Sequence, residues 1–327
     1  MADARWCGPG AARVLARGGS GSVVAAFGGG GYLRLPGGFV LVVPPGSPRG
    51  PLTLVVDGLV APALRARVVV SRSASAPALA VGAAVISLGR FVDRDGTRRA
   101  AAPAPRAPSP SAPAPASPAL APASPSPSAP APAVAACARA ALAAVPPPPD
   151  ELRAGIATLA AGDHGGAVRL LAGLGDGLTP AGDDVLAGHA AWRWAVGDPV
   201  PLRSSATERC SPIGLAYLEC AQRGELAPFA AEVLRAILTG DAHGAARLAR
   251  RCTEWGASSG AALIWGMTTG PWRRAEASGR AGCLTGAALR HSPAVGVVAR
   301  FAPPYRTDLP PADRPRGGAT VVGRAAA

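Results

Sequence analysis

Apolar positions in the first ninety residues come in short runs that are separated by turn-forming residues. Clusters such as Gly28–Gly31, Pro36–Gly38 and Pro44–Gly50 are strong turn signals. The runs between the turns are rich in β-branched and other apolar residues, as strands are: Val23–Phe27, Tyr32–Leu35, Phe39–Val43, Leu52–Val56, Ala66–Ser71 and Ala84–Leu88. Several short strands at this spacing predict a small antiparallel sheet or barrel.

From Asp150 to about Leu289 the sequence changes to segments bounded by helix-capping residues. Ser211 before Pro212, and Asp241, are typical N-caps, and Gly240 is typical of a helix end. Five helices follow from these signals: Asp150–Leu159, Pro212–Gly224, Ala227–Leu238, Asp241–Trp255 and Ser259–Met267. Consecutive helices with short loops predict an α-helical bundle, and the fold class is therefore α+β.

A segment of different composition separates the two parts. Residues 100–149 are almost wholly Ala, Pro and Ser, and only Ala133–Val145 could form a short helix. Such a segment buries too little apolar surface to offset the entropy lost on ordering. We expect a β-rich domain over 1–99, a disordered linker over 100–149, a helical domain over 150–302 and a disordered tail over 303–327.

The net charge of +13 suggests nucleic-acid binding at first, but other features argue against it. All 33 basic residues are arginines scattered along the chain, and aromatic residues make up only 4% of it. A base-stacking surface needs more aromatic side chains than this. The longest apolar run, Leu79–Leu88, is too short to span a membrane. We expect a cytoplasmic protein that binds neither nucleic acid nor membrane.

The stretch with the strongest functional signal runs from Gly173 to Asp184, with the sequence GLGDGLTPAGDD. Glycines at alternate positions allow positive φ angles and close approach of the backbone to a ligand. Thr179 is expected to cap the helix that follows, with Pro180 at its first position. Because free N–H groups at a helix N-terminus bind anions, we predict an anion or substrate site here, formed by Gly175, Gly177, Leu178, Thr179 and Gly182.

Asp183 and Asp184 lie in the first turn of that predicted helix. In one interpretation they only stabilise the helix dipole. In the other they are catalytic, and either bind a divalent cation such as Mg²⁺ beside an anionic substrate or accept hydrogen bonds from a substrate amide. Because helix-dipole stabilisation explains one aspartate better than two adjacent ones, the functional interpretation is favoured.

Further polar residues are candidates for the same site. Ser211, Ser258, Ser259 and Gly260 lie at the starts of two predicted helices, where hydroxyl and amide groups are available. The pattern Gly256-x-Ser258-x-Gly260 formally matches a hydrolase nucleophile elbow, but that motif needs a strand before it, and a helix is predicted there. The four histidines show no metal-binding spacing.

Residues 173–188 resemble the signature of a bacterial family, first defined as a domain of unknown function, that includes the AllH subunit of oxamate carbamoyltransferase. The blocks 207–224 and 256–260 agree with the family pattern in order and spacing, and residues 20–100 and 150–290 fit it more broadly. The resemblance implies a part in carbamoyl transfer between oxalurate and phosphate during allantoin breakdown, as one subunit among several. Phosphate or carbamoyl phosphate would then be the small anionic ligand.

Three functional hypotheses follow from these observations. The chain is a carbamoyltransferase or a subunit of one, a non-catalytic subunit that binds a metabolite, or an assembly subunit whose glycine motif packs against a catalytic partner. The first is favoured by the resemblance, and the sequence alone leaves the other two open.

Overall fold

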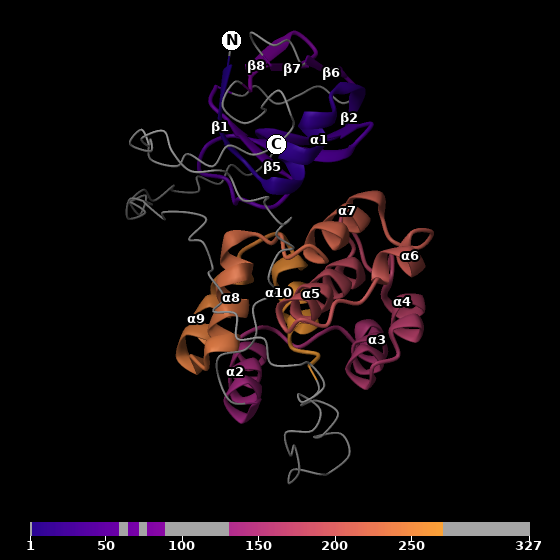
Figure 1. Ribbon diagram of the computed structural model, residues 1–327, viewed down its shortest axis with the longest axis vertical. Helices are drawn as coiled ribbons and strands as arrows, with labels where there is room; N and C mark the ends of the chain where they lie inside the picture. Colours follow the sequence, from indigo (N-terminus) through magenta and orange to yellow (C-terminus); the bar gives the residue numbers. More distant parts are fainter. Residues whose placement is uncertain (1, 59–64, 72–76, 89–130, 271–327) are drawn as a thin grey trace, which may run out of the picture.

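The computed structural model describes residues 2–58, 65–71, 77–88 and 131–270. A β-barrel forms the N-terminal part, and a set of helices forms the rest, as Figure 1 shows. The predicted α+β order, a small barrel followed by a helical bundle, is confirmed. No described helix has both the length and the apolar character needed to cross a bilayer.

The barrel closes in the strand order β1-β5-β4-β3-β2-β6-β7-β8. Its strands have these bounds: β1 Ala2–Cys7, β2 Gly19–Phe27, β3 Gly30–Leu35, β4 Gly38–Val43, β5 Thr53–Val56, β6 Arg67–Ser71, β7 Ala78–Val81 and β8 Ala84–Ser87. Most neighbouring strands are antiparallel, but β1 pairs with β8, and β4 with β5, in parallel. The barrel is therefore mixed and not purely antiparallel.

Local sequence explains the central hairpins of the barrel. Phe27 pairs with Gly30 across a two-residue turn, and Gly29 in that turn has a φ of 87°. This left-handed conformation is the one that tight hairpin turns require and that glycine adopts without strain. The helix α1 (Pro9–Arg17), which the apolar pattern does not predict, packs against β4 and β5.

In the helical part, α5 lies at the centre. The helices have these bounds: α2 Ala131–Ala143, α3 Asp150–Ala161, α4 His164–Leu171, α5 Ala181–Ala195, α6 Leu202–Ala206, α7 Pro212–Ala221, α8 Pro228–Thr239, α9 Ala242–Cys252 and α10 Ser259–Met267. Figure 1 shows α5 and α10 surrounded by the other helices. The two backbones touch, because a Cβ added at Gly188 would lie 2.1 Å from the carbonyl oxygen of Leu263.

The helix α2 lies inside the segment that was expected to be a disordered linker. Its residues Val134, Ala138 and Ala141 are buried, and it packs against α8 and α9. The helical domain therefore starts before residue 150, because these small side chains cover the core. The disorder expected for residues 100–130 and 303–327, and the helices expected after residue 270, lie outside the described residues.

The helix α7 joins the two parts. Tyr217 and Ile213 pack against Tyr32, Phe39 and Leu52 of the barrel in a small apolar cluster. The hydroxyl groups of Tyr32 and Tyr217 lie 3.2 Å apart.

An ion pair between Arg13 of α1 and Glu225, just after α7, adds a charged contact across the same boundary. The barrel is thus fixed to the side of the helical part that carries α7.

Candidate functional site

The predicted glycine loop is a series of tight turns before α5. Gly173, Gly175 and Gly177 have φ angles of 77°, 108° and 97°, the left-handed conformations for which glycine is suited. The helix begins at Ala181, with Pro180 as the N-cap residue, so Thr179 does not cap it as expected. Because Pro180 takes the capping position, the hydroxyl group of Thr179 is directed elsewhere and lies 3.2 Å from Ser259 Oγ.

Three N–H groups at the start of α5, including that of the predicted anion-site residue Gly182, already have partners within the chain. The amide of Gly182 donates to the carbonyl oxygen of Leu174 at 2.9 Å, and the amides of Asp183 and Asp184 donate to that of Pro180. The start of α5 therefore offers an anion fewer donors than a free helix N-terminus would. Anion binding by the Gly175–Thr179 loop remains a prediction.

Asp183 is fully buried, and both of its carboxylate oxygens accept backbone N–H groups. Oδ1 accepts from Gly173 at 2.7 Å, and Oδ2 accepts from Ser211 at 2.8 Å. Gly214 makes room for this carboxylate, because a Cβ there would lie 2.2 Å from Oδ2. Asp183 therefore ties the start of the glycine loop to the start of α7.

Asp184 is also buried, at 4% exposure, but its surroundings differ. The hydroxyl groups of Ser259 and Thr179 hydrogen-bond to its carboxyl group. Burial, together with the charge of Asp183, raises its pKa to about 7, and the two hydroxyl groups oppose the shift. Within the described part of the chain, its Oδ2 has no hydrogen-bond partner.

A small cavity lies beside Asp184, between the helices and the barrel. The centre of a water molecule can occupy about 20 Å³ of this cavity, so the cavity has room for a group about as large as one water molecule. Its polar lining residues are Asp184, Tyr217 and Glu225, and Trp255, Leu226 and Leu263 are the largest apolar ones. Pro51 reaches it from the barrel side. The sequence analysis did not identify Tyr217, Glu225 or Trp255, and only Trp255 had a local signal, since it directly precedes the Gly256–Gly260 block.

The remaining candidate residues have structural contacts. Ser211 accepts the amide of Gly214 at 2.9 Å as the N-cap of α7, and its hydroxyl donates to the carbonyl oxygen of Leu178. Ser258 is the N-cap residue of α10 without a side-chain capping bond.

Gly182 and Gly260 allow close packing, because a Cβ at either position would lie within 2 Å of a carbonyl oxygen. Of the predicted residues, the structure thus brings together Thr179, Asp184 and Ser259, of which Asp184 lines the cavity, and the contacts described for Asp183, Ser211, Gly182 and Gly260 hold the loop and the helices.

The described residues add no cluster of metal-binding side chains to the predicted cation site at Asp183 and Asp184. No group of three or more His, Cys, Asp or Glu side chains suited to a metal occurs among the described residues. Asp183 is engaged by two backbone amides, so Asp184 is the member of the pair with a free oxygen. The predicted Mg²⁺ site remains untested.

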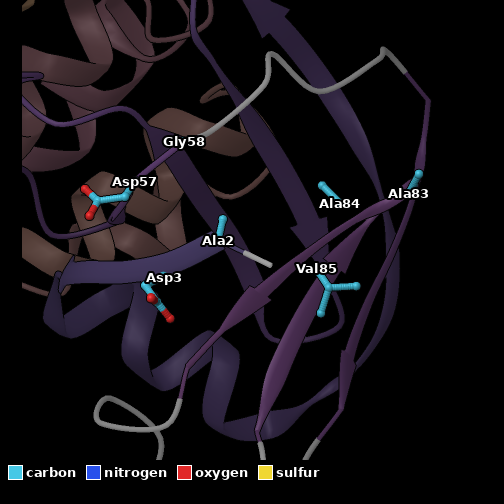
Figure 2. Close-up of a pocket in the computed structure, with 7 residues that line it drawn as sticks. All are labelled: Ala2, Asp3, Asp57, Gly58, Ala83, Ala84 and Val85. Carbon is cyan, nitrogen blue, oxygen red and sulfur yellow. The ribbon is translucent and has the colours of Figure 1, made fainter.

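A larger hollow of about 450 Å³ lies at one end of the barrel, away from these residues. Figure 2 shows the carboxylate groups of Asp3 and Asp57 on one side of it and the side chains of Ala84 and Val85 on the other. Asp57 forms an ion pair with Arg5. None of the predicted site residues lines this hollow, so it does not enter the argument for function.

Comparisons with known proteins agree with the geometry of the helical part. Neither a curated protein nor a solved structure matches the chain. A family model described as oxamate carbamoyltransferase subunit AllH matches residues 171–271, the range that holds the glycine loop, both aspartates and helices α5 to α10. The barrel lies outside the match. Over residues 171–271 the chain is therefore similar to the AllH family of oxamate carbamoyltransferase subunits, as the sequence resemblance predicts.

Proposed function

We propose that the chain is a subunit of an oxamate carbamoyltransferase-type enzyme and that its reactive residue is Asp184. The observation that carries the proposal is a buried carboxyl group beside a cavity, with one oxygen that has no hydrogen-bond partner among the described residues and a pKa of about 7. Buried acids with perturbed pKa values in a cavity are candidates for functional groups. The match to the AllH family over the same residues supports the reaction class.

The chemistry of the three converging side chains suits a carbamoyl group. At neutral pH Asp184 is present in both protonation states, so it can accept a hydrogen bond from an amide N–H or give up a proton. The hydroxyl groups of Thr179 and Ser259, 3.2 Å apart, hold its carboxyl group in place. The free amides of the Gly175–Thr179 loop are the nearest candidates for the anionic part of a substrate.

The size of the cavity supports the role of a subunit. A space for one water-sized group cannot enclose two reactants. The matched family is itself described as a subunit. Other chains of the assembly would then supply the rest of the site.

A second hypothesis is that the chain binds a metabolite without turning it over. Its support is the structural use of Asp183, Ser211, Gly182 and Gly260, which leaves fewer residues free for chemistry than the sequence suggested.

A carbamoyl-transfer assay on the full chain, alone and together with its partner subunits, separates the two hypotheses. Asp184→Asn should lower the transfer rate about 100-fold or more, the usual contribution of a positioned acid or base. Asp150→Asn is the control, because that side chain is 88% exposed at the start of α3. Full activity of Asp184→Asn would refute the proposal, and ligand binding without turnover in every combination would favour the second hypothesis.

A further inference from the structure

The cavity beside Asp184 has a second carboxyl group in its wall. Glu225 lies in the connection between α7 and α8, and within the described residues its Oε2 is buried without a hydrogen-bond partner. Asp184 and Glu225 thus both line the same cavity, and each has one buried oxygen without a hydrogen-bond partner among the described residues. A buried acceptor without a partner costs free energy unless a donor reaches it, and two in one cavity indicate that a donor-bearing group fits there.

The barrel fixes the position of Glu225. Arg13 of α1 pairs with Oε1 of Glu225, and its guanidinium group also lies 3.7 Å from Cys220 Sγ. One oxygen of Glu225 is therefore paired with the barrel side, while the other has no partner among the described residues. The N-terminal part of the chain, which lies outside the family match, in this way completes the wall of the cavity.

The charges in the wall exclude one class of ligand. Among the described residues that line the cavity there is no Arg, Lys or His. A carboxylate or phosphate placed there would lie against two carboxyl groups and lose its hydration, and Arg13 behind Glu225 is already engaged in an ion pair. A neutral –NH₂ group has two N–H donors, carries no charge and is about as large as a water molecule.

We propose that this cavity receives the –NH₂ end of a primary amide, and that Glu225 is a specificity-determining residue that distinguishes this amide from the corresponding acid. The anionic end of the substrate then lies outside the cavity, on the glycine loop or on a partner subunit. The inference rests on the proposed function only in placing the substrate beside Asp184.

Oxamate and oxalate are matched probes for this selection, since they differ in one –NH₂ group that is replaced by a carboxylate oxygen. Calorimetric titration of the full chain should show oxamate binding at least about 10-fold tighter than oxalate, because a site built for an N–H donor rejects the analogue that lacks it. Glu225→Gln should reduce this ratio to about 3-fold or less, because the side-chain amide can turn its own N–H donors towards the cavity.

Glu219→Gln is the matched control, because Glu219 also pairs with arginines but on the outer side of α7. It should keep the wild-type ratio. If Glu225→Gln does not fold, Glu225→Asp tests the same point, because it keeps the charge and withdraws the carboxylate from the cavity.

Equal binding of oxamate and oxalate by the wild-type chain, an unchanged ratio in the Glu225 variants, or no oxamate binding would overturn the inference. The transfer assay with Asp184→Asn is independent of this ratio. If the transfer rate depends on Asp184 but the ratio of oxamate to oxalate affinity does not change in the Glu225 variants, the proposed function is supported and selection by Glu225 is refuted.

Discussion

The barrel and the helical part bury different kinds of residues. Among the described residues, Thr53 is the one residue of the barrel that is buried and classed as polar or charged, and the barrel core is mainly aliphatic. The helical part buries Asp183, Asp184, His189, Thr268 and Thr269. Burying polar and charged groups costs free energy unless they are fully hydrogen-bonded. The comparison indicates that the barrel serves as a scaffold and that the chemistry belongs to the helical part.

The same contrast recurs between two adjacent residues of α5. Asp183 has both oxygens bonded to backbone amides, whereas Asp184 lines a cavity and has one oxygen without a partner among the described residues. Adjacent helix positions point about 100° apart, so the two carboxylates meet different neighbours. One aspartate holds the fold together, and the other is available for a substrate.

The largest expected effect on stability is that of Asp183→Ala. The substitution leaves the buried amides of Gly173 and Ser211 without an acceptor, at about 1–3 kcal/mol each, so the free energy of unfolding should fall by about 4 kcal/mol. Urea denaturation followed by circular dichroism measures it. Asp150→Ala, on the surface, should change the free energy by less than about 0.5 kcal/mol. If the loss for Asp183→Ala is no larger than that of this control, Asp183 is not the structural tie described above.

A core substitution in the barrel tests whether the barrel affects ligand binding or only stability. Leu33 is fully buried in the barrel core, and Leu33→Ala should cost about 3 kcal/mol through lost burial and the cavity left behind. The oxamate affinity of the molecules that remain folded should stay within about 2-fold of wild type, because Leu33 contacts no residue of the cavity wall. A large change in affinity would show that the barrel does more than support the site.

The pH dependence of stability distinguishes Asp184 from its neighbour. Its pKa rises from 3.8 to about 7 on folding, so the folded state binds this proton more tightly than the unfolded state. The resulting stabilisation is complete below about pH 3.8 and is lost as the pH rises towards 7, with a slope of at most about 1.4 kcal/mol per pH unit. Asp184→Asn should remove this slope in urea denaturation at several pH values. Identical pH profiles for both proteins would contradict the raised pKa.

His189 changes stability in the opposite direction. Burial, with the charges of His164 and Arg193, lowers its pKa from 6.5 to about 3. Its contribution is therefore present above about pH 6.5 and is lost as the pH falls towards 3. His189→Gln should reduce the loss of stability on acidification, whereas the exposed His243→Gln should not. Equal acid sensitivity of the two variants would show that His189 does not titrate in this range.

Local signals in the sequence were sufficient for much of the fold. The Ser211 and Asp241 caps are confirmed, because their side chains accept the amides of Gly214 and Gly244. The expected Asp150 cap is wrong by one position, since Pro149 is the N-cap and Asp150 is the first helical residue.

The features of the fold that the sequence did not predict depend on contacts between residues far apart in the chain. The parallel pairing of β1 with β8 joins Ala2 to Ile86, and no local pattern specifies such a pair. The sequence allows a short helix at Ala133–Val145, and α2 overlaps it, but the segment is so rich in alanine that it has no distinct polar face, and its place in the helical core could not be predicted.

The candidate site was predicted only in part for the same reason. The Gly173–Asp184 motif contains Asp184, which lines a cavity, and Thr179, whose hydroxyl group lies beside Ser259. The roles of the two aspartates could not be separated from the sequence, because they depend on the backbone of Ser211 and the hydroxyl group of Ser259. Glu225 lines the cavity and pairs with Arg13, more than two hundred residues earlier, and no local pattern predicts this contact.

A smaller effect is expected for Ser259→Ala. Its hydroxyl group hydrogen-bonds to Asp184 and lowers the pKa of that carboxyl group. Loss of this bond should raise the pKa by less than about one unit and cost about 1 kcal/mol of stability. A carboxyl-carbon NMR titration of Asp184 in the variant measures the shift. A lower pKa in Ser259→Ala would contradict the described hydrogen bond.

The most direct test of the account is the titration of Asp184 itself, in the wild-type chain with and without oxamate. The carboxyl-carbon NMR signal, assigned by its absence in Asp184→Asn, should titrate with a midpoint of about 7. Oxamate should lower this midpoint, because N–H donors favour the ionised carboxylate. A midpoint near 3.8, the ordinary value, or a midpoint that oxamate does not move, would contradict the assignment of Asp184 as the residue that meets the substrate.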